Sequence, residues 1–312
     1  MNIDMINAAA LRLQGHARLT PLLNAPLLDA IAGRRVFVKA ECLQWTGSFK
    51  FRGGWAAVSA LRGAKGVIAY SSGNHAQGVA LAAARHGLEA VILMPSDAPS
   101  VKIANTRAYG AEVILYDRNT ADRDALGAEL VAARGLEFIK PYDQPEVIAG
   151  QGTIGLEIAA QFDGEAEVLT CCGGGGMTSG IALALEGRMR VRPVEPEGFD
   201  DVARSLISGV RERNATLSGS VCDAIVTPCA GEMTFPIMKR LCGAGIAVSD
   251  EEALRAMVLA FEHLRIVLEP GGAVALAAAL FRPDLPETVI AVASGGNVDP
   301  AIFANALARF GG

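Results

Sequence analysis

Short apolar segments alternate with longer alanine-rich segments along most of the chain. The apolar segments are rich in Val, Ile and Leu, and they cover residues 36–41, 66–72, 90–95, 111–117, 136–141, 167–172, 189–196 and 288–296. The alanine-rich segments are typical of helices and cover residues 74–87, 120–134, 146–163, 177–187, 249–266 and 271–281. Strands that are apolar on both faces and separated by helices are typical of parallel sheets covered on two sides. The pattern therefore predicts a doubly wound α/β fold.

Polar or glycine-rich segments follow four of the predicted strands directly. "GVIAY" runs into "SSGNHAQG", "EVLTCC" into "GGGGMTSG", "MRVRPV" into "EPEGFDD" and "TVIAVA" into "SGGN". In doubly wound sheets, ligands bind beyond the carboxyl ends of the strands. We therefore expect these four segments to form the functional site.

Composition excludes several classes of function. The 312 residues suffice for about two domains or one large α/β unit, and 51% of them are hydrophobic, which allows a sizeable core. The formal net charge is −5 and there is no basic run, so we expect neither a nucleic-acid partner nor an anionic membrane partner. The N-terminus does not resemble a signal peptide, and the longest apolar run, residues 273–281, is too short to span a bilayer. A cytoplasmic protein with a small-molecule substrate is the expectation.

The six cysteines, at positions 42, 171, 172, 222, 229 and 242, indicate neither a zinc site nor a redox motif. They form no C-x-x-C pair, and no cysteine–histidine spacing is typical of zinc. We expect buried, reduced thiols.

The stretch "TGSFKFRGG", residues 46–54, places Lys50 between two phenylalanines. Two interpretations are open. In the first, Lys50 is an ordinary solvated lysine at the start of a helix, which the stretch alone favours. In the second, it is partly desolvated, which would lower its pKa and free a neutral amine to attack a carbonyl.

Four consecutive glycines, Gly173–Gly176, separate a predicted strand from a predicted helix. Successive amides without side chains can converge on an anion, and the positive end of a helix adds to the attraction, so a phosphate is the expected ligand. The alternative is a tight turn without a ligand. Neither the dinucleotide fingerprint G-x-G-x-x-G nor the P-loop fits the loop. A phosphorylated aldehyde, pyridoxal phosphate, would explain both the loop and an amine nucleophile.

From about residue 16 to residue 300, the chain resembles the serine/threonine dehydratase and serine racemase family of fold-type II pyridoxal phosphate enzymes. The resemblance is carried by "SFKFRG", "SSGNHAQG", "PEVIAGQGTIGLEI", "GGGGMTSG", "EPGGAVALAA" and "SGGNVD", in the family's order. It implies the tryptophan synthase β-like fold, with two doubly wound parallel-sheet domains and the site between them. We place the large, cofactor-binding domain at residues 1–55 plus 145–312 and the small, substrate-side domain at residues 56–144.

The resemblance also implies roles in holding the cofactor. Lys50 would form a Schiff base with pyridoxal phosphate, Phe49 would pack against its ring, and Asn74 would hydrogen-bond its phenolic oxygen. Ser294 would donate to the pyridine nitrogen. The phosphate would be bound by the backbone amides of Gly173, Gly174, Gly175, Gly176 and Met177.

For the substrate, the resemblance implies that Ser72 faces the cofactor on the side opposite Lys50. The substrate carboxylate would rest on Ser71, Asn74 and His75 at the start of their helix. Arg123 matches only loosely an arginine that binds a substrate carboxylate in racemases, and an exposed helix-face arginine is the alternative.

A divalent cation is a further expectation from the resemblance. Glu195, Asp201 and the backbone carbonyl of Phe199 fall where the family holds one, and such ligands suit Mg²⁺ or Ca²⁺. A solvated acidic loop is the alternative.

The resemblance implies a serine/threonine dehydratase, an ammonia-lyase that converts a hydroxy-amino acid to a 2-oxo acid and ammonia. The alternatives are a serine or aspartate racemase, a 3-hydroxyaspartate dehydratase, and an idle binder of amino acid or cofactor. Two departures leave the substrate open: "CDA" at residues 222–224 replaces the family's Ala-Asp-Gly, and Tyr142 stands where racemases tend to carry Asn. By analogy with the family, we expect a homodimer.

Overall fold

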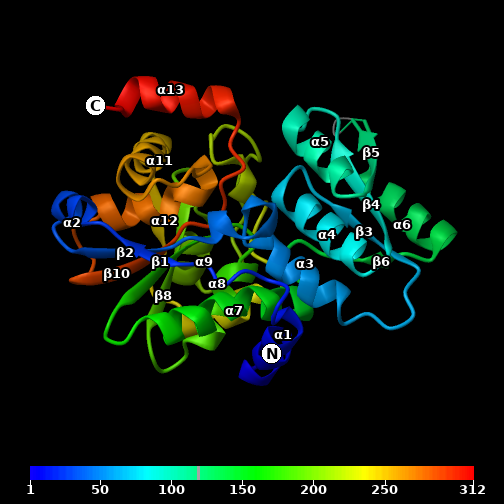
Figure 1. The fold of residues 1–312 in the computed structure, drawn as a ribbon, viewed down its shortest axis with the longest axis horizontal. Helices are drawn as coiled ribbons and strands as arrows, with labels where there is room; N and C mark the ends of the chain where they lie inside the picture. The colour runs from blue at the N-terminus through cyan, green and yellow to red at the C-terminus, as the bar shows by residue number, and fades with distance from the viewer. Residues whose placement is uncertain (118–119) are drawn as a thin grey trace.

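The computed structural model describes residues 1–117 and 120–312, and it contains two sheets flanked by helices (Figure 1). In spatial order, the larger sheet consists of β1 (Leu22–Asn24), β2 (Arg35–Lys39), β10 (Thr288–Val292), β7 (Glu167–Cys171), β8 (Arg190–Pro196) and β9 (Ile246–Val248). The smaller sheet consists of β5 (Glu112–Tyr116), β4 (Glu89–Pro95), β3 (Gly66–Tyr70) and β6 (Glu137–Phe138). Neighbouring strands are parallel except β1, which pairs antiparallel with β2. The predicted α/β class is confirmed.

Helices cover both sheets. Around the larger sheet lie α1 (Ile3–Leu13), α2 (Pro26–Ala32), α7 (Pro145–Gln161), α8 (Gly176–Ala184), α9 (Asp201–Ser208), α10 (Thr234–Leu241), α11 (Asp250–Leu264), α12 (Pro270–Phe281) and α13 (Pro300–Phe310). Around the smaller sheet lie α4 (Asn74–Arg85), α5 (Ser100–Ala108) and α6 (Arg123–Arg134), and α3 (Lys50–Val58) lies between the two sheets. Short 3₁₀ turns are η1 (Glu41–Leu43), η2 (Trp45–Gly47) and η3 (Asp223–Ile225).

The longest apolar run of the sequence forms the central helix of the core. α12 is buried from Pro270 to Leu280 and packs against β7, β8 and β10. A helix that is apolar all round is typical of such a position. The helix predicted over residues 271–281 is therefore a core helix, and it packs on the middle strands of the larger sheet.

Glycines let α3 approach its neighbours closely. A Cβ added at Gly54 would lie 3.0 Å from the backbone of Gly78 in α4, and one at Gly150 in α7 would lie 2.6 Å from the carbonyl oxygen of Arg52. A Cβ at Gly78 would lie 2.9 Å from the backbone of Lys50. These glycines stand in three of the stretches quoted above. They bring the beginning of α3 close to α4, which covers the smaller sheet, and to α7, which covers the larger sheet.

The domain boundaries, 1–55 plus 145–312 and 56–144, stay a prediction. The smaller sheet draws only on residues 66–138, which all lie in the predicted small domain. Among the described residues, no helix is both long enough and apolar enough to cross a membrane.

Candidate active site

The segment that carries Lys50 lies against the segment that carries Ser294. Ser48 forms an isolated antiparallel bridge with Gly295. The amide of Phe49 donates to the carbonyl oxygen of Ser294 at 3.0 Å, and the amide of Gly296 donates to the carbonyl oxygen of Gly47 at 2.9 Å. The motifs "SFKFRG" and "SGGN" therefore form one backbone-bonded unit.

The amine of Lys50 is desolvated. Its Nζ donates to the carbonyl oxygen of Pro141 at 2.7 Å and lies 5.2 Å from the centre of the Phe49 ring. Burial lowers the pKa of Lys50 to about 8. Of the two interpretations of this lysine, the structure supports the desolvated amine.

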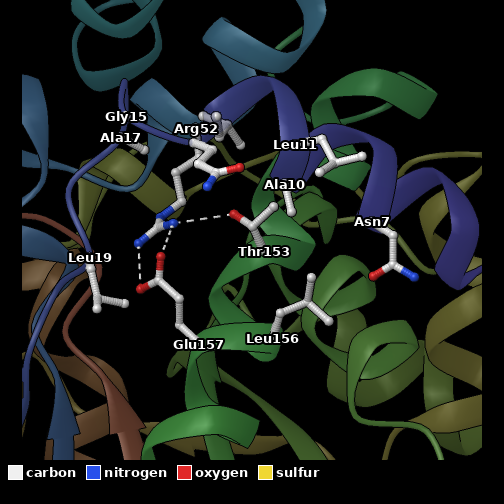
Figure 2. Close-up of a pocket in the computed structure, with 12 residues that line it drawn as sticks. Asn7, Ala10, Leu11, Gly15, Ala17, Leu19, Arg52, Thr153, Leu156 and Glu157 are labelled. Carbon is white, nitrogen blue, oxygen red and sulfur yellow. Dashed lines mark hydrogen bonds and ion pairs between the residues drawn. The ribbon is translucent and has the colours of Figure 1, made fainter.

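Arg52, two residues beyond Lys50, holds the first turn of α3 in place through ion pairs, of which Figure 2 shows the one with Glu157. Its guanidinium donates to both carboxylate oxygens of Glu41 at 2.8 Å and to those of Glu157 at 2.6 and 2.9 Å. Thr153 accepts a further hydrogen bond at 3.2 Å. Such bidentate pairs are directional, so they fix the helix turn from which Lys50 projects.

A hollow of about 580 Å³ lies on the far side of this ion-pair network, between α1 and α7 (Figure 2). Leu11, Leu19 and Leu156 line it together with Arg52 and Glu157. The lining residues include none of the residues proposed to bind cofactor or substrate. The hollow is therefore separate from the candidate site.

The glycine loop leads into α8 without a capping side chain from the described residues. Gly175 adopts φ +85°, a left-handed conformation that favours glycine. A Cβ added at Gly174 would lie 2.3 Å from the ring of Tyr142, so that position is closed to any larger residue. The first amides of α8 therefore remain open to an anion such as a phosphate.

Thr234, the first residue of α10, bonds this loop, and Asp143 bonds the segment just before α10; the sequence predicted neither contact. The hydroxyl of Thr234 donates to the carbonyl oxygen of Gly174 at 2.6 Å. The carboxylate of Asp143 accepts from the amides of Glu232 and Met233 at 3.1 and 2.8 Å.

Asn74 is held at both ends of its side-chain amide. Its Nδ2 donates to the buried carboxylate of Glu269, and its Oδ1 accepts from Nδ2 of Asn297 at 2.8 Å. Glu269 also forms a 3.6 Å ion pair with the buried Lys102. The network fixes which end of Asn74 is the donor. Sequence reasoning missed Glu269 and Asn297, although both stand in quoted motifs, "EPGGAVALAA" and "SGGNVD".

The segment 71–75 offers backbone groups and hydroxyls at the start of α4. The Ser71 hydroxyl accepts from the amide of Gly73 at 3.1 Å, and Ser72 is exposed. The His75 ring points to the carbonyl oxygen of Ile139 through Nε2 at 3.0 Å. Burial, with the nearby charge of Lys50, lowers the pKa of His75 to about 3, so the ring is neutral. The backbone amide of His75, rather than its ring, is the group left for a substrate carboxylate.

Ser294 is buried beside Cys171, the last residue of β7. The thiol of Cys171 donates to the hydroxyl oxygen of Ser294 at 3.1 Å. All six cysteines lie within the described residues and are free thiols.

The carboxylate of Glu195, a residue of β8, lies at the start of α9, where Asp201 is the first residue. Glu195 accepts from the amides of Val202 and Ala203 at 3.0 and 2.7 Å, and Asn214 donates to Oδ1 of Asp201 at 2.6 Å. Burial, followed by the charge of Asp201, raises the pKa of Glu195. In the described part of the chain, Oδ2 of Asp201 is buried without a hydrogen-bond partner.

The carboxylates of Glu195 and Asp201, with the carbonyl of Phe199, are the donors that the sequence suggested for a cation. The described residues contain no group of three or more His, Cys, Asp and Glu side chains that could hold a metal ion. An unpartnered carboxylate oxygen beside a second carboxylate still fits a hard cation that takes its remaining ligands from backbone carbonyls and water.

Comparison with known proteins gives consistent matches over almost the whole chain. Residues 13–295 match the family model described as "Pyridoxal-phosphate dependent enzyme". The chain is 42% identical to an L-threo-3-hydroxyaspartate ammonia-lyase from Pseudomonas sp., covering 97% of each protein. It is 38% identical to a serine racemase from Schizosaccharomyces pombe, covering 98% of this chain and 97% of that protein. Among solved structures, a threonine deaminase from T.th. matches with a TM-score of 0.90 and 43% identity, covering 96% of this chain and 99% of that chain.

Proposed function

Because the chain belongs to the family of pyridoxal-phosphate dependent enzymes, we propose that it is an ammonia-lyase that converts a hydroxy-amino acid to a 2-oxo acid and ammonia. The observation that carries the proposal is the desolvated amine of Lys50. The preceding residue, Phe49, bonds the backbone of Ser294, and α3 packs against α4. An idle binder would need no such amine.

The residues present fit pyridoxal phosphate. The open amides at the start of α8 suit its phosphate, the amine of Lys50 suits its aldehyde, and the fixed Nδ2 of Asn74 suits its phenolic oxygen. Phe49, buried next to Lys50, supplies an apolar surface for its ring. When bound, the cofactor serves as an electron sink for negative charge at the substrate Cα.

Lys50 is the proposed base. With a pKa of about 8 in place of 10.5, about a tenth of its amine is neutral at pH 7 and can take the Cα proton of the substrate. The carbonyl of Pro141 orients that amine. The substrate carboxylate would bind the hydroxyl of Ser71 and the amides of Asn74 and His75 at the start of α4, where the described residues supply no side-chain cap.

Ser72 is proposed on the face opposite Lys50, where a proton returned to Cα would give racemisation. Serine racemases are among the relatives of the chain, so this activity is the second candidate. The outcome depends on whether the β-hydroxyl leaves before Cα is reprotonated.

The position of Arg123 favours 3-hydroxyaspartate as the substrate among the hydroxy-amino acids. The guanidinium of Arg123 lies 5.6 Å from the centre of the Tyr70 ring, and its charge acts to lower the pKa of Tyr142, which burial raises overall. Tyr142 itself packs on the glycine loop. A cation at this place can pair with the second carboxylate of a dicarboxylic substrate. Two relatives that are 42% and 38% identical are L-threo-3-hydroxyaspartate ammonia-lyases.

We also propose that Glu195, Asp201 and the carbonyl of Phe199 bind Mg²⁺ or Ca²⁺, and that the protein is a cytoplasmic homodimer. The unpartnered Oδ2 of Asp201 supports the cation site. Family analogy supports the homodimer.

Separate incubations with L-serine, L-threonine and L-threo-3-hydroxyaspartate test the proposal. We expect 2-oxo acid and ammonia in equal amounts, with the highest kcat/KM for 3-hydroxyaspartate. Formation of D-amino acid without ammonia would identify a racemase, and no product from any substrate would favour the binder. The variant Arg123→Gln should lower kcat/KM for 3-hydroxyaspartate and leave that for L-serine nearly unchanged.

A further inference from the structure

Cys171 places a thiol beside the hydroxyl of Ser294. Cys171 is the last residue of β7, and Ser294 comes shortly after the end of β10. These two strands are parallel neighbours, with Val292 of β10 in register with Thr170 of β7. The two side chains therefore leave the same edge of the sheet, with Sγ and Oγ 3.1 Å apart. Both residues are 4% exposed, so water does not compete for this contact.

The thiol is the donor in this pair. Burial raises the pKa of Cys171 to about 11, so the sulfur keeps its hydrogen at neutral pH. A thiol sulfur is a weak acceptor, whereas a hydroxyl oxygen offers two lone pairs. The hydrogen bond thus runs from Cys171 into the oxygen of Ser294.

A serine hydroxyl has a single hydrogen, and this contact leaves that hydrogen for another acceptor. The main chain of Ser294 is fixed as well, because its amide donates to Gly272 at 3.3 Å and its carbonyl accepts from Phe49 at 3.0 Å. Both the position of the hydroxyl and one of its lone pairs are therefore set before a ligand binds.

We propose that Cys171 is a positioning residue that turns the Ser294 hydroxyl hydrogen toward the ring nitrogen of pyridoxal phosphate, so that this nitrogen stays an unprotonated acceptor. The inference rests on the proposed function, because it needs the cofactor ring beside Ser294. An unprotonated ring nitrogen is a weaker electron sink than a protonated one. Such a ring suits a substrate that loses a leaving group from Cβ.

The test uses the holoenzyme reconstituted with pyridoxal phosphate that carries nitrogen-15 in its ring, and it follows the ring-nitrogen NMR shift. In Cys171→Ala, we expect that shift to move toward the value of a pyridine nitrogen without a donor, and kcat/KM to fall about fivefold, the effect of losing roughly one neutral hydrogen bond. Cys171→Ser supplies a hydroxyl donor and should restore both values. The control Cys242→Ala removes a half-buried thiol outside the site and should change neither.

A wild-type ring-nitrogen shift in Cys171→Ala overturns the inference, as does a Cys171→Ser enzyme that behaves like Cys171→Ala. If neither variant folds, the Raman S–H band decides. In Ser294→Ala, the band of Cys171 should move to higher frequency because its acceptor is gone, and an unmoved band overturns the inference. Failure of the proposed function looks different, since the wild-type holoenzyme would then release no 2-oxo acid and ammonia from any of the hydroxy-amino acids, whatever the ring-nitrogen shift of the variants.

Discussion

The ε-amine of Lys50 donates a 2.7 Å hydrogen bond to the carbonyl oxygen of Pro141 and has no carboxylate partner among the described ion pairs. Burial without a countercharge explains why the pKa of Lys50 falls to about 8 from an ordinary 10.5. The amine attacks an aldehyde only when neutral, and it is neutral above its pKa. The rate at which the apoprotein binds pyridoxal phosphate should therefore rise with pH up to about 8 and then level off.

Stopped-flow absorbance at a series of pH values measures this rate. Nα-acetyl-lysine, whose amine is fully solvated, is the control, and its reaction should keep accelerating toward pH 10. A rate for the protein that parallels this control would contradict a desolvated Lys50.

Gly174 should tolerate no side chain. In Gly174→Ala, the new Cβ meets the Tyr142 ring at 2.3 Å, so the loop or the ring must move. Overpacking of this kind costs about 1–3 kcal/mol, so the cofactor dissociation constant should rise roughly tenfold. Fluorescence titration measures it.

Two comparisons separate this effect from general damage. Gly174→Ala combined with Tyr142→Ala should recover affinity, because the obstructing ring is gone. Gly187→Ala, where a Cβ meets no described atom within 4 Å, should strain the backbone without changing cofactor affinity. Equal affinities for Gly174→Ala and the wild type would contradict the assigned role of the loop.

Arg52 should matter for stability far more than an exposed arginine does. Arg52→Met leaves the buried carboxylate of Glu41 without its guanidinium partner and the half-buried carboxylate of Glu157 with Lys39 alone, and breaking a buried pair typically costs about 3–5 kcal/mol. The matched variant Arg134→Met breaks exposed pairs with Glu89 and Glu112 and should leave the denaturation midpoint nearly unchanged. Urea denaturation followed by circular dichroism compares them. Similar midpoints for both variants would show that the network does not anchor α3.

A bound cation should stabilise the loop before α9. Mg²⁺ would satisfy Oδ2 of Asp201, so adding it to chelator-treated protein should raise Tm in proportion to log concentration once the site is saturated. Asp201→Asn should abolish the increase. Asp250→Asn, at an acidic residue on another helix, is the control and should retain it. Equal responses of wild type and Asp201→Asn would count against the site.

The long, uniformly apolar or alanine-rich segments could be predicted from the sequence because a strand or helix that is buried on all sides is apolar along its whole length. β7 and α12 show this most clearly, since all five residues of the strand and nearly all of the helix are buried. β1 and β9 have three residues each, too few for a pattern, and were missed. A helix start was expected near Lys50, but the extent of α3 was not predicted, because Gly53 and Gly54 disfavour a helix and only packing against α4 and α7 overcomes that preference.

Residues of the candidate site could be predicted where they stand in a recognisable motif. Contacts between residues from distant segments could not, because they depend on how strands and helices are arranged in the fold. Lys50 and the glycine loop stand out in the sequence. The contact of Cys171 with Ser294 depends on β10 lying beside β7, and that of Asn74 with Glu269 depends on how α4 meets the start of α12. Neither arrangement follows from local pattern.

The bond between Lys50 and pyridoxal phosphate is the central claim, and borohydride reduction followed by peptide mass spectrometry tests it most directly. Reduction of the reconstituted protein should leave one stable phosphopyridoxyl group, on the peptide that contains Lys50, and Lys50→Ala should carry none and lose turnover. A reduced protein without that group, a group on another lysine, or a fully active Lys50→Ala variant would contradict the account.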